Sequence, residues 1–180
     1  MGRAAKSYAA YYTVAEWEHW QDQWELIAGV PYCMSPAPSS RHQRINFLIA
    51  HQLELSIKSS LCRKCKVYIP IDWQISEDTV VQPDILVVCK PIGENRLYDR
   101  PEIIFEILSP STKQKDRTIK FDLYQEQKVP FYVLVNPDTE EVEIYLLEQD
   151  TSYTLAPFDS IFTFQLGECA IEIDFRNVWE

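Results

Sequence analysis

Hydrophobic residues recur every three or four positions in two long segments of the chain, which predicts amphipathic helices over residues 40–59 and 113–128. A shorter helix is expected over residues 13–20. A Thr or Ser followed three residues later by Glu or Gln typically begins a helix, because each side chain satisfies a backbone N–H group of the other residue. Two such capping pairs are present, Thr13 with Glu16 and Ser111 with Gln114.

The other hydrophobic segments predict strands. Residues 66–75 alternate between hydrophobic and polar positions, as in a strand with one buried face, whereas residues 79–89 and 102–108 are more uniformly hydrophobic, as in strands covered on both faces. Further strands are expected in a hairpin over 24–34, over 131–135, and around 142–146, 153–155, 162–166 and 171–175. This order predicts an α/β (α+β) fold with a central mixed β-sheet flanked by helices, an N-terminal hairpin and a β-rich C-terminal extension.

Length and composition are those of an ordinary globular domain. The chain has 180 residues, of which 46% are hydrophobic and 24% charged. We therefore expect one domain over residues 1–180, with a core over about 39–137 and a C-terminal part over about 138–180. No hydrophobic run approaches a membrane span, and no hydrophobic stretch follows the basic N-terminus as in a signal peptide. The five cysteines, an odd number, favour reduced thiols and a cytoplasmic protein.

The net charge of −10 argues at first against a nucleic-acid partner, because polyanions are bound mainly through their phosphates. However, the excess lies entirely in residues 138–180, which hold eleven acidic residues and one basic residue. Basic residues cluster in the neutral remainder, at Arg41, Arg44, Lys58, Arg63, Lys64 and Lys66, and again at Lys113, Lys115, Arg117 and Lys120. Such clusters also occur on ordinary solvated surfaces, so charge alone neither supports nor excludes nucleic-acid binding.

Two acids stand out because their neighbours are hydrophobic. Asp84 and Glu106 each lie within a segment that predicts a buried strand. A buried carboxylate needs a cationic partner, hydrogen bonds, a proton or a metal ion. Two carboxylates on adjacent strands suit Mg²⁺ or Mn²⁺, which accept oxygen ligands and complete their shell with water and phosphate. The alternative is that each acid pairs with a Lys or Arg, or accepts hydrogen bonds from backbone amides.

The same residues resemble a known family. Pro83–Asp84 followed by Glu106 is similar to the pattern of the PD-(D/E)XK nucleases, which have the restriction-endonuclease-like fold. The surrounding segments resemble the Uma-type endonuclease family of that superfamily: 24–29 (WELIAG), 34–43 (MSPAPSSRHQ), 82–84 (QPD), 106–112 (EILSPST), 116–120 (DRTIK), Tyr124 and 135–137 (VNP). The resemblance runs from about Thr13 to Trp179. It implies a restriction-endonuclease-like core with a Mg²⁺-dependent site that cleaves phosphodiester bonds.

The chain departs from the superfamily pattern at one position. A lysine is expected two residues after the second acid, but Leu108 is found there, on the face of the strand that carries Glu106. The resemblance to the Uma-type family implies that this lysine has moved to the following helix. Asp116, Lys120 and Tyr124 share one helical face, so we expect Lys120 to reach back to Glu106. The alternative for Lys120 is an ion pair with Asp116 on a solvated face.

Three further residues are candidates for the site. Glu25, in the hairpin that matches the family, would steady Lys120 or bind metal through water, unless it is an exposed hairpin carboxylate. His42 and Arg41, near the start of the long helix, are candidate phosphate contacts, and His42 could also act as an acid or base. The alternative for His42 is a capping or surface histidine.

Together these residues predict a metal-dependent DNA endonuclease. In this hypothesis Asp84 and Glu106 hold Mg²⁺ or Mn²⁺, and Lys120 positions the attacking water or stabilises charge in the transition state. A homodimer is expected, because cutting both strands calls for two sites. The alternative is a catalytically inactive nuclease-fold module that binds protein or nucleic acid, which Leu108 and the net charge favour. A hydrolase acting on RNA or on a smaller phosphodiester is also compatible with these residues.

Overall fold

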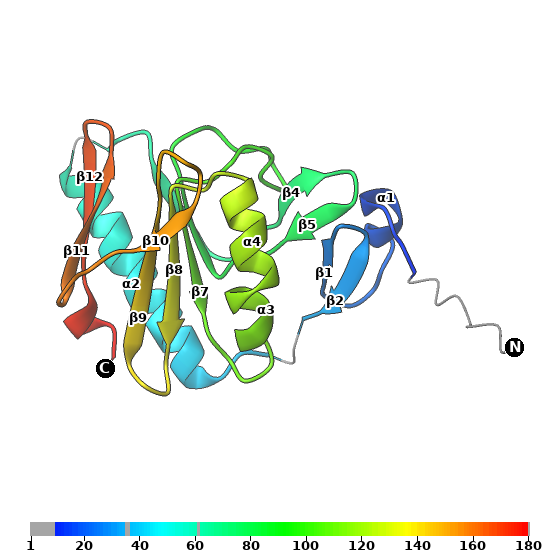
Figure 1. The fold of residues 1–180 in the computed structure, drawn as a ribbon, viewed down its shortest axis with the longest axis horizontal. Helices are drawn as coiled ribbons and strands as arrows, with labels where there is room; N and C mark the ends of the chain where they lie inside the picture. Colours follow the sequence, from blue (N-terminus) through cyan, green and yellow to red (C-terminus); the bar gives the residue numbers. More distant parts are fainter. Residues whose placement is uncertain (1–9, 35–36, 61, 180) are drawn as a thin grey trace, which may run out of the picture.

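The computed structural model describes residues 10–34, 37–60 and 62–179. A six-stranded mixed sheet forms its centre, in the order β10-β9-β8-β7-β6-β3 (Figure 1). Strands β7 and β8 run parallel, and all the other neighbours in this sheet run antiparallel. The strands are β3 (Lys66–Tyr68), β6 (Ile85–Val88), β7 (Ile103–Ile107), β8 (Phe131–Asn136), β9 (Glu141–Leu147) and β10 (Tyr153–Leu155). The predicted mixed central sheet is confirmed.

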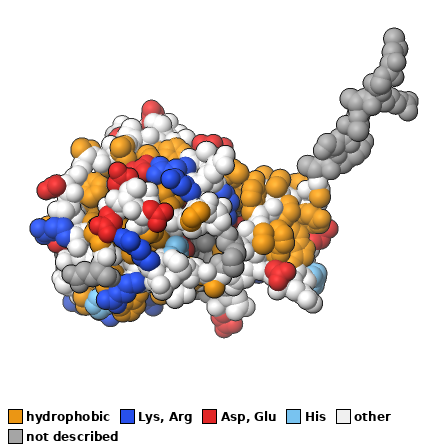
Figure 2. All heavy atoms as spheres, turned by 90° about the horizontal axis from the view of Figure 1, so that it is seen from below, with side chains coloured by type: hydrophobic (Ala, Val, Ile, Leu, Met, Phe, Trp, Pro, Cys, Tyr) orange, Lys and Arg blue, Asp and Glu red, His pale blue; other side chains and the backbone are white. Residues whose placement is uncertain are grey.

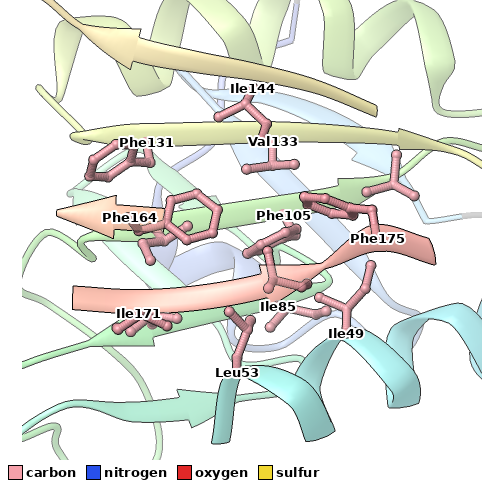
Figure 3. Packing of buried hydrophobic residues seen from close by; sticks show 14 of the residues in the cluster. Ile49, Leu53, Ile85, Phe105, Phe131, Val133, Ile144, Phe164, Ile171 and Phe175 are labelled. Atoms are coloured by element: carbon pink, nitrogen blue, oxygen red, sulfur yellow. The ribbon is translucent and has the colours of Figure 1, made fainter. Parts of the chain in front are cut away.

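One face of this sheet is covered by α2 (Ser40–Ser59) and by the hairpin of β11 (Ile161–Leu166) and β12 (Cys169–Asp174), which a 3₁₀ turn at Phe175–Asn177 follows. The predicted helix over 40–59 is confirmed, and its N-cap is Ser39, whose hydroxyl accepts a hydrogen bond from a backbone N–H of the first turn. Leu53 of α2 packs with Phe105 and Phe164 in this layer (Figure 3).

The other face of the sheet is covered by α3 (Lys113–Arg117) and α4 (Ile119–Glu126) (Figure 1). One continuous helix was expected here, but the chain breaks at Thr118, where φ is −126° and ψ is −79°. The cause is a tertiary contact: the Tyr132 hydroxyl donates a 2.9 Å hydrogen bond to the carbonyl of Asp116, which would accept from Lys120 in a continuous helix. The Thr118 hydroxyl also bonds back to the Gln114 carbonyl, a contact that bends helices.

A smaller lobe is formed by α1 (Val14–Trp17) and a four-stranded sheet in the order β2-β1-β5-β4. These strands are β1 (Trp24–Ile27), β2 (Val30–Cys33), β4 (Trp73–Ser76) and β5 (Thr79–Val81). The predicted hairpin and the capping pair at α1 are both present. In Figure 2 this lobe carries a broad hydrophobic patch, whereas Lys and Arg side chains gather on the larger body.

Two predicted strands are each divided between the two sheets. The strand expected over 66–75 is β3 in the large sheet and β4 in the smaller lobe, with Pro70 between them. The strand expected over 79–89 is β5 and β6, with Pro83 and Asp84 between them. Proline has no N–H group for a sheet ladder, so the chain leaves one sheet and enters the other at these points. The consequence is a crevice between the lobe and the large sheet.

The expectation of reduced thiols is wrong for four of the five cysteines. The structure joins Cys62 to Cys169 and Cys65 to Cys89, while Cys33 is free and exposed. Cys65 and Cys89 stand opposite each other at the end of the β3–β6 ladder, and Cys169 begins β12, which packs on α2. The pairing therefore follows from packing between segments that are distant in the sequence. No helix in the described part of the chain is long and apolar enough to cross a membrane.

Candidate active site

Asp84 and Glu106 lie next to each other across two neighbouring strands. Ile85 pairs with Phe105 in the antiparallel ladder of β6 and β7, and each acid lies one residue beyond this pair. Both line a cavity of about 500 Å³ in the crevice between the lobe and the large sheet. Glu106 is buried, as expected, but Asp84 occupies the bend before β6, and its side chain is 25% exposed. Asp84 is thus held at the cavity wall and not inside a strand.

Glu106 is held by two donors from α4. The ammonium group of Lys120 and the hydroxyl of Tyr124 each donate a 2.8 Å hydrogen bond to Glu106 Oε1. Burial, together with the carboxylates of Asp116 and Asp84, raises the pKa of Glu106 well above its usual value. Lys120 is itself only 3% exposed, so the alternative of an ion pair on a solvated face is excluded. The predicted reach of Lys120 back to Glu106 is what the structure shows.

Glu25 is buried, not an exposed hairpin carboxylate. Its Oε1 lies 2.7 Å from Lys120 Nζ and accepts a 2.9 Å hydrogen bond from the backbone N–H of Gln82, while its Oε2 accepts from Lys115. Burial alone would raise the pKa of Glu25, but the two ammonium groups outweigh it and lower the pKa below its usual value. Because Glu25 belongs to β1 and Glu106 to β7, Lys120 bridges the smaller lobe and the large sheet.

Lys115, Asp116 and Tyr124 were not expected among the site residues. Asp116 is buried near Lys120, with 3.8 Å between Oδ1 and Nζ, and this Oδ1 accepts no hydrogen bond from the described residues. Burial raises the pKa of Asp116 above its usual value. The helical spacing of Asp116, Lys120 and Tyr124 was a signal for two of these residues. Nothing in the sequence distinguishes Lys115 from the neighbouring Lys113.

The two residues expected near phosphate lie at the start of α2 and line the cavity. His42 is largely buried, and its Nε2 is 3.3 Å from Asp84 Oδ2, which also accepts a 2.7 Å hydrogen bond from the N–H of Ile107. Burial opposes protonation of His42, but the bond to Asp84 outweighs it and raises the pKa of the imidazole. Arg41 is half exposed and pairs with Glu140 at 2.7 Å.

Leu108 lies on the same face of the chain as Glu106, as expected. Its side chain is buried in the hydrophobic cluster beneath α4, together with Ile104 and Tyr124. No cation can approach Glu106 from this position, so Lys120 and Lys115 supply the positive charge of the site from α4 and α3.

The carboxylate oxygens that accept no hydrogen bond suit a hard divalent cation. Among the described residues, Asp84 Oδ1 and Glu106 Oε2 accept no hydrogen bond, although the other oxygen of each carboxylate is engaged. The cavity is lined by five acidic residues and by Arg41, His42 and the two lysines; the acids are Glu25, Asp84, Glu106, Asp116 and Asp138. No group of three or more His, Cys, Asp or Glu side chains within the described ranges has metal-binding geometry. The residues therefore fit a cation with two protein ligands and a shell completed by water and substrate, as Mg²⁺ commonly has.

Comparisons with known proteins bear on the family and the fold. The chain aligns over residues 8–172 with the model of the Uma2 family, described as a putative restriction endonuclease. The fold is similar to the crystal structure of a putative nuclease of the DUF820 group from Anabaena variabilis, with a TM-score of 0.74 and 19% identity, over 93% of this chain and 97% of that one. An uncharacterised Synechocystis protein is 26% identical over 103 residues, which are 53% of this chain and only 54% of that protein. The chain belongs to the Uma2 restriction endonuclease-like family.

Proposed function

We propose that the protein hydrolyses phosphodiester bonds of DNA with the aid of Mg²⁺ or Mn²⁺. The observation that carries this proposal is the pair of carboxylates, Asp84 before β6 and Glu106 in β7, which line the same cavity, each with one oxygen unused by the described residues. These two residues would hold the cation. When bound, such an ion polarises the phosphate and lowers the pKa of its water ligand.

The two lysines have different surroundings, and we assign them different roles. Lys120 is almost fully buried and holds Glu25 and Glu106 together, so it positions both acids and neutralises part of their charge. The side chain of Lys115 is 13% exposed at the cavity and pairs with Glu25 alone among the described acids. Lys115 is therefore the ammonium group placed to contact a phosphate oxygen. His42 keeps the Asp84 carboxylate oriented through its Nε2.

The test is cleavage of supercoiled plasmid with Mg²⁺ or Mn²⁺ by the wild type and by Asp84→Asn, Glu106→Gln and Lys115→Met. We expect metal-dependent nicking that each substitution lowers by about 100-fold or more, because each removes a metal ligand or a phosphate contact. The matched control is Asp99→Asn, a carboxylate that pairs with the exposed Lys90 at 3.1 Å and does not line the cavity. It should cleave like the wild type.

Nicking that is independent of metal, or equal in all these proteins, would reject the proposal. It would favour the alternative of a catalytically inactive module, which Leu108 in the usual lysine position also suggests. Parallel reactions with single-stranded RNA and with a small phosphodiester decide the substrate class. Light scattering of the purified protein tests the expected homodimer.

A further inference from the structure

The outer face of α2 carries a continuous stripe of basic, aromatic and aliphatic side chains. Its members follow one another at intervals of three or four residues along the helix: Arg44, Phe47, His51, Leu55 and Lys58. All five are exposed, and they lie opposite the buried face that holds Ile45, Ile49, Leu53 and Ile57. We call these five residues the α2 stripe. It is solvent-facing and therefore has no role in the hydrophobic core.

The side chains of the stripe are arranged as a platform. The Arg44 guanidinium lies over the ring of Phe47, 5.8 Å from its centroid. The rings of Phe47 and His51 lie nearly parallel, at 6° and 5.8 Å between centroids. Phe47 and Leu55 are each 53% exposed. Stacked, solvent-exposed rings beside an arginine offer a flat apolar surface and a positive charge to the same ligand.

The sequence segment that contains the stripe has a charge opposite to that of the whole protein. Residues 40–66 contain six basic residues and one acidic residue, in a chain of net charge −10. The acidic residue, Glu54, is paired with Lys58 at 3.2 Å. Arg44 forms no ion pair with the residues that the structure describes. Arg44 is therefore the cation of the stripe that is available to a polyanion.

The stripe begins where the active-site cavity ends. Ser39, Arg41 and His42, in the cap and first turn of α2, line the cavity. Arg44 lies in the next turn, roughly 5 Å further along the helix axis. A polymer that leaves the cavity past Arg41 thus reaches the Arg44 guanidinium first and the rings of Phe47 and His51 next.

We propose that the α2 stripe binds the nucleic-acid strand that leads into the cavity. The phosphates contact Arg44 and Lys58, and unpaired bases stack on Phe47 and His51. This inference rests on the proposed function, since it takes the substrate to be a nucleic acid. It adds the path of the strand and a preference for single-stranded segments, because only unpaired bases offer a free ring face.

The test measures the fluorescence anisotropy of a labelled 20-nucleotide single strand and of its duplex, with EDTA present to prevent cleavage. We expect Phe47→Ala to weaken binding of the single strand by about five-fold or more, and the duplex less. Arg44→Ala should lower the slope of log affinity against log salt by about 0.7. Leu155→Ala and Lys90→Ala are matched controls, an exposed leucine on β10 and an exposed lysine outside the stripe, and should bind like the wild type.

Equal binding by the wild type, Phe47→Ala and Arg44→Ala would overturn the inference, and so would equal losses in the two controls. If Phe47→Ala instead turns a dimer into a monomer in light scattering and leaves nucleic-acid affinity unchanged, the stripe is a self-association surface and the inference is wrong. These failures are distinct from failure of the proposed function. If only the inference about the stripe fails, the wild type still nicks plasmid with Mn²⁺. If the proposed function fails, nicking by the wild type is absent or does not depend on metal.

Discussion

At the scale of single residues, the site is an arrangement of buried charges that compensate one another. Lys120 contacts Glu25 and Glu106, and a third acid, Asp116, lies near it. A buried ion pair adds little net stability, but removal of one partner leaves the other without compensation in a medium of low polarity. Substitutions at these positions are therefore expected to affect folding as well as chemistry, and the two effects must be measured separately.

Glu25→Gln should lower the free energy of unfolding by about 3 kcal/mol, the lower end of the range for a broken buried pair, because Lys120 keeps Glu106 as a partner. Urea denaturation of both proteins at pH 7 measures this difference. Glu18→Gln is the control: Glu18 is half exposed and pairs with Arg96 at 3.0 Å, so its loss should cost about 1 kcal/mol or less. Equal losses in the two variants would contradict the prediction.

The same carboxylate predicts a dependence on pH. The folded state lowers the pKa of Glu25 below its value in the unfolded chain, about 4.3. Its contribution to stability is therefore complete above that value and is lost as the pH falls through the lower, folded pKa. Between pH 5 and pH 3 the wild type should lose more unfolding free energy than Glu25→Gln. Parallel curves of urea midpoint against pH would show that Glu25 is not the group responsible.

At the scale of elements, covalent and packing contacts fix the C-terminal hairpin to the helix layer. Phe164 of β11 and Ile171 of β12 lie in the core beside α2, and Cys169 joins the start of β12 to Cys62, just after that helix. The hairpin forms a two-stranded sheet of its own, and a pair of strands has little stability without such contacts. The stability of this layer should therefore depend on the redox state of the protein.

Cys169→Ser should lower the free energy of unfolding under oxidising conditions by about 2–4 kcal/mol, because the Cys62–Cys169 bond closes a long loop in the unfolded chain. The difference in unfolding free energy between the variant and the wild type should shrink once dithiothreitol is added. Urea unfolding with and without the reductant measures both effects. Cys33→Ser, at the free exposed cysteine, is the control and should match the wild type. An oxidised wild type no more stable than Cys169→Ser would contradict the pairing.

At the scale of the whole molecule, the smaller lobe and the large sheet meet at the active-site cavity. Glu25 comes from the lobe, Glu106 from the sheet and Lys120 from the helix layer, so the site exists only when all three parts are assembled. Charge is also unevenly distributed along the chain: basic residues are concentrated in 40–66 and acidic residues in 138–180, part of which, β12, packs on α2. Local charge, not the total of −10, decides what each surface attracts.

Binding of Mg²⁺ to the folded protein alone should raise its thermal stability. At a free concentration 100 times the dissociation constant the gain is about 2.7 kcal/mol. Differential scanning fluorimetry across a Mg²⁺ titration measures it, and Asp84→Asn should abolish the shift while Asp99→Asn keeps it. An equal shift in the wild type and Asp84→Asn would place the ion elsewhere.

Much of this arrangement was predictable from the sequence, for physical reasons that also mark its limits. Hydrophobic periodicity depends on local geometry and correctly gave α2 and the order of helices and strands, but it merged β3 with β4 and β5 with β6. The break at Thr118 and the partners of the cysteines depend on contacts across the fold, which periodicity does not contain. The approach of Lys120 to Glu106 was expected from the family resemblance together with helical spacing, whereas the position of Lys115 beside Glu25 depends on how the lobe meets α3.

The bridge that Lys120 forms between Glu25 and Glu106 limits what recombination can do with this protein. An engineer who grafts the β1–β2 hairpin of a homologue onto this scaffold must bring an acid at the position of Glu25, or leave the ammonium group without half of its counter-charge. Conversely, if the hairpin is moved to another scaffold, the Glu25 carboxylate loses both of its lysine partners, Lys115 and Lys120. The hairpin and α4 must therefore be exchanged together, or the lost ion pair must be restored by a further substitution.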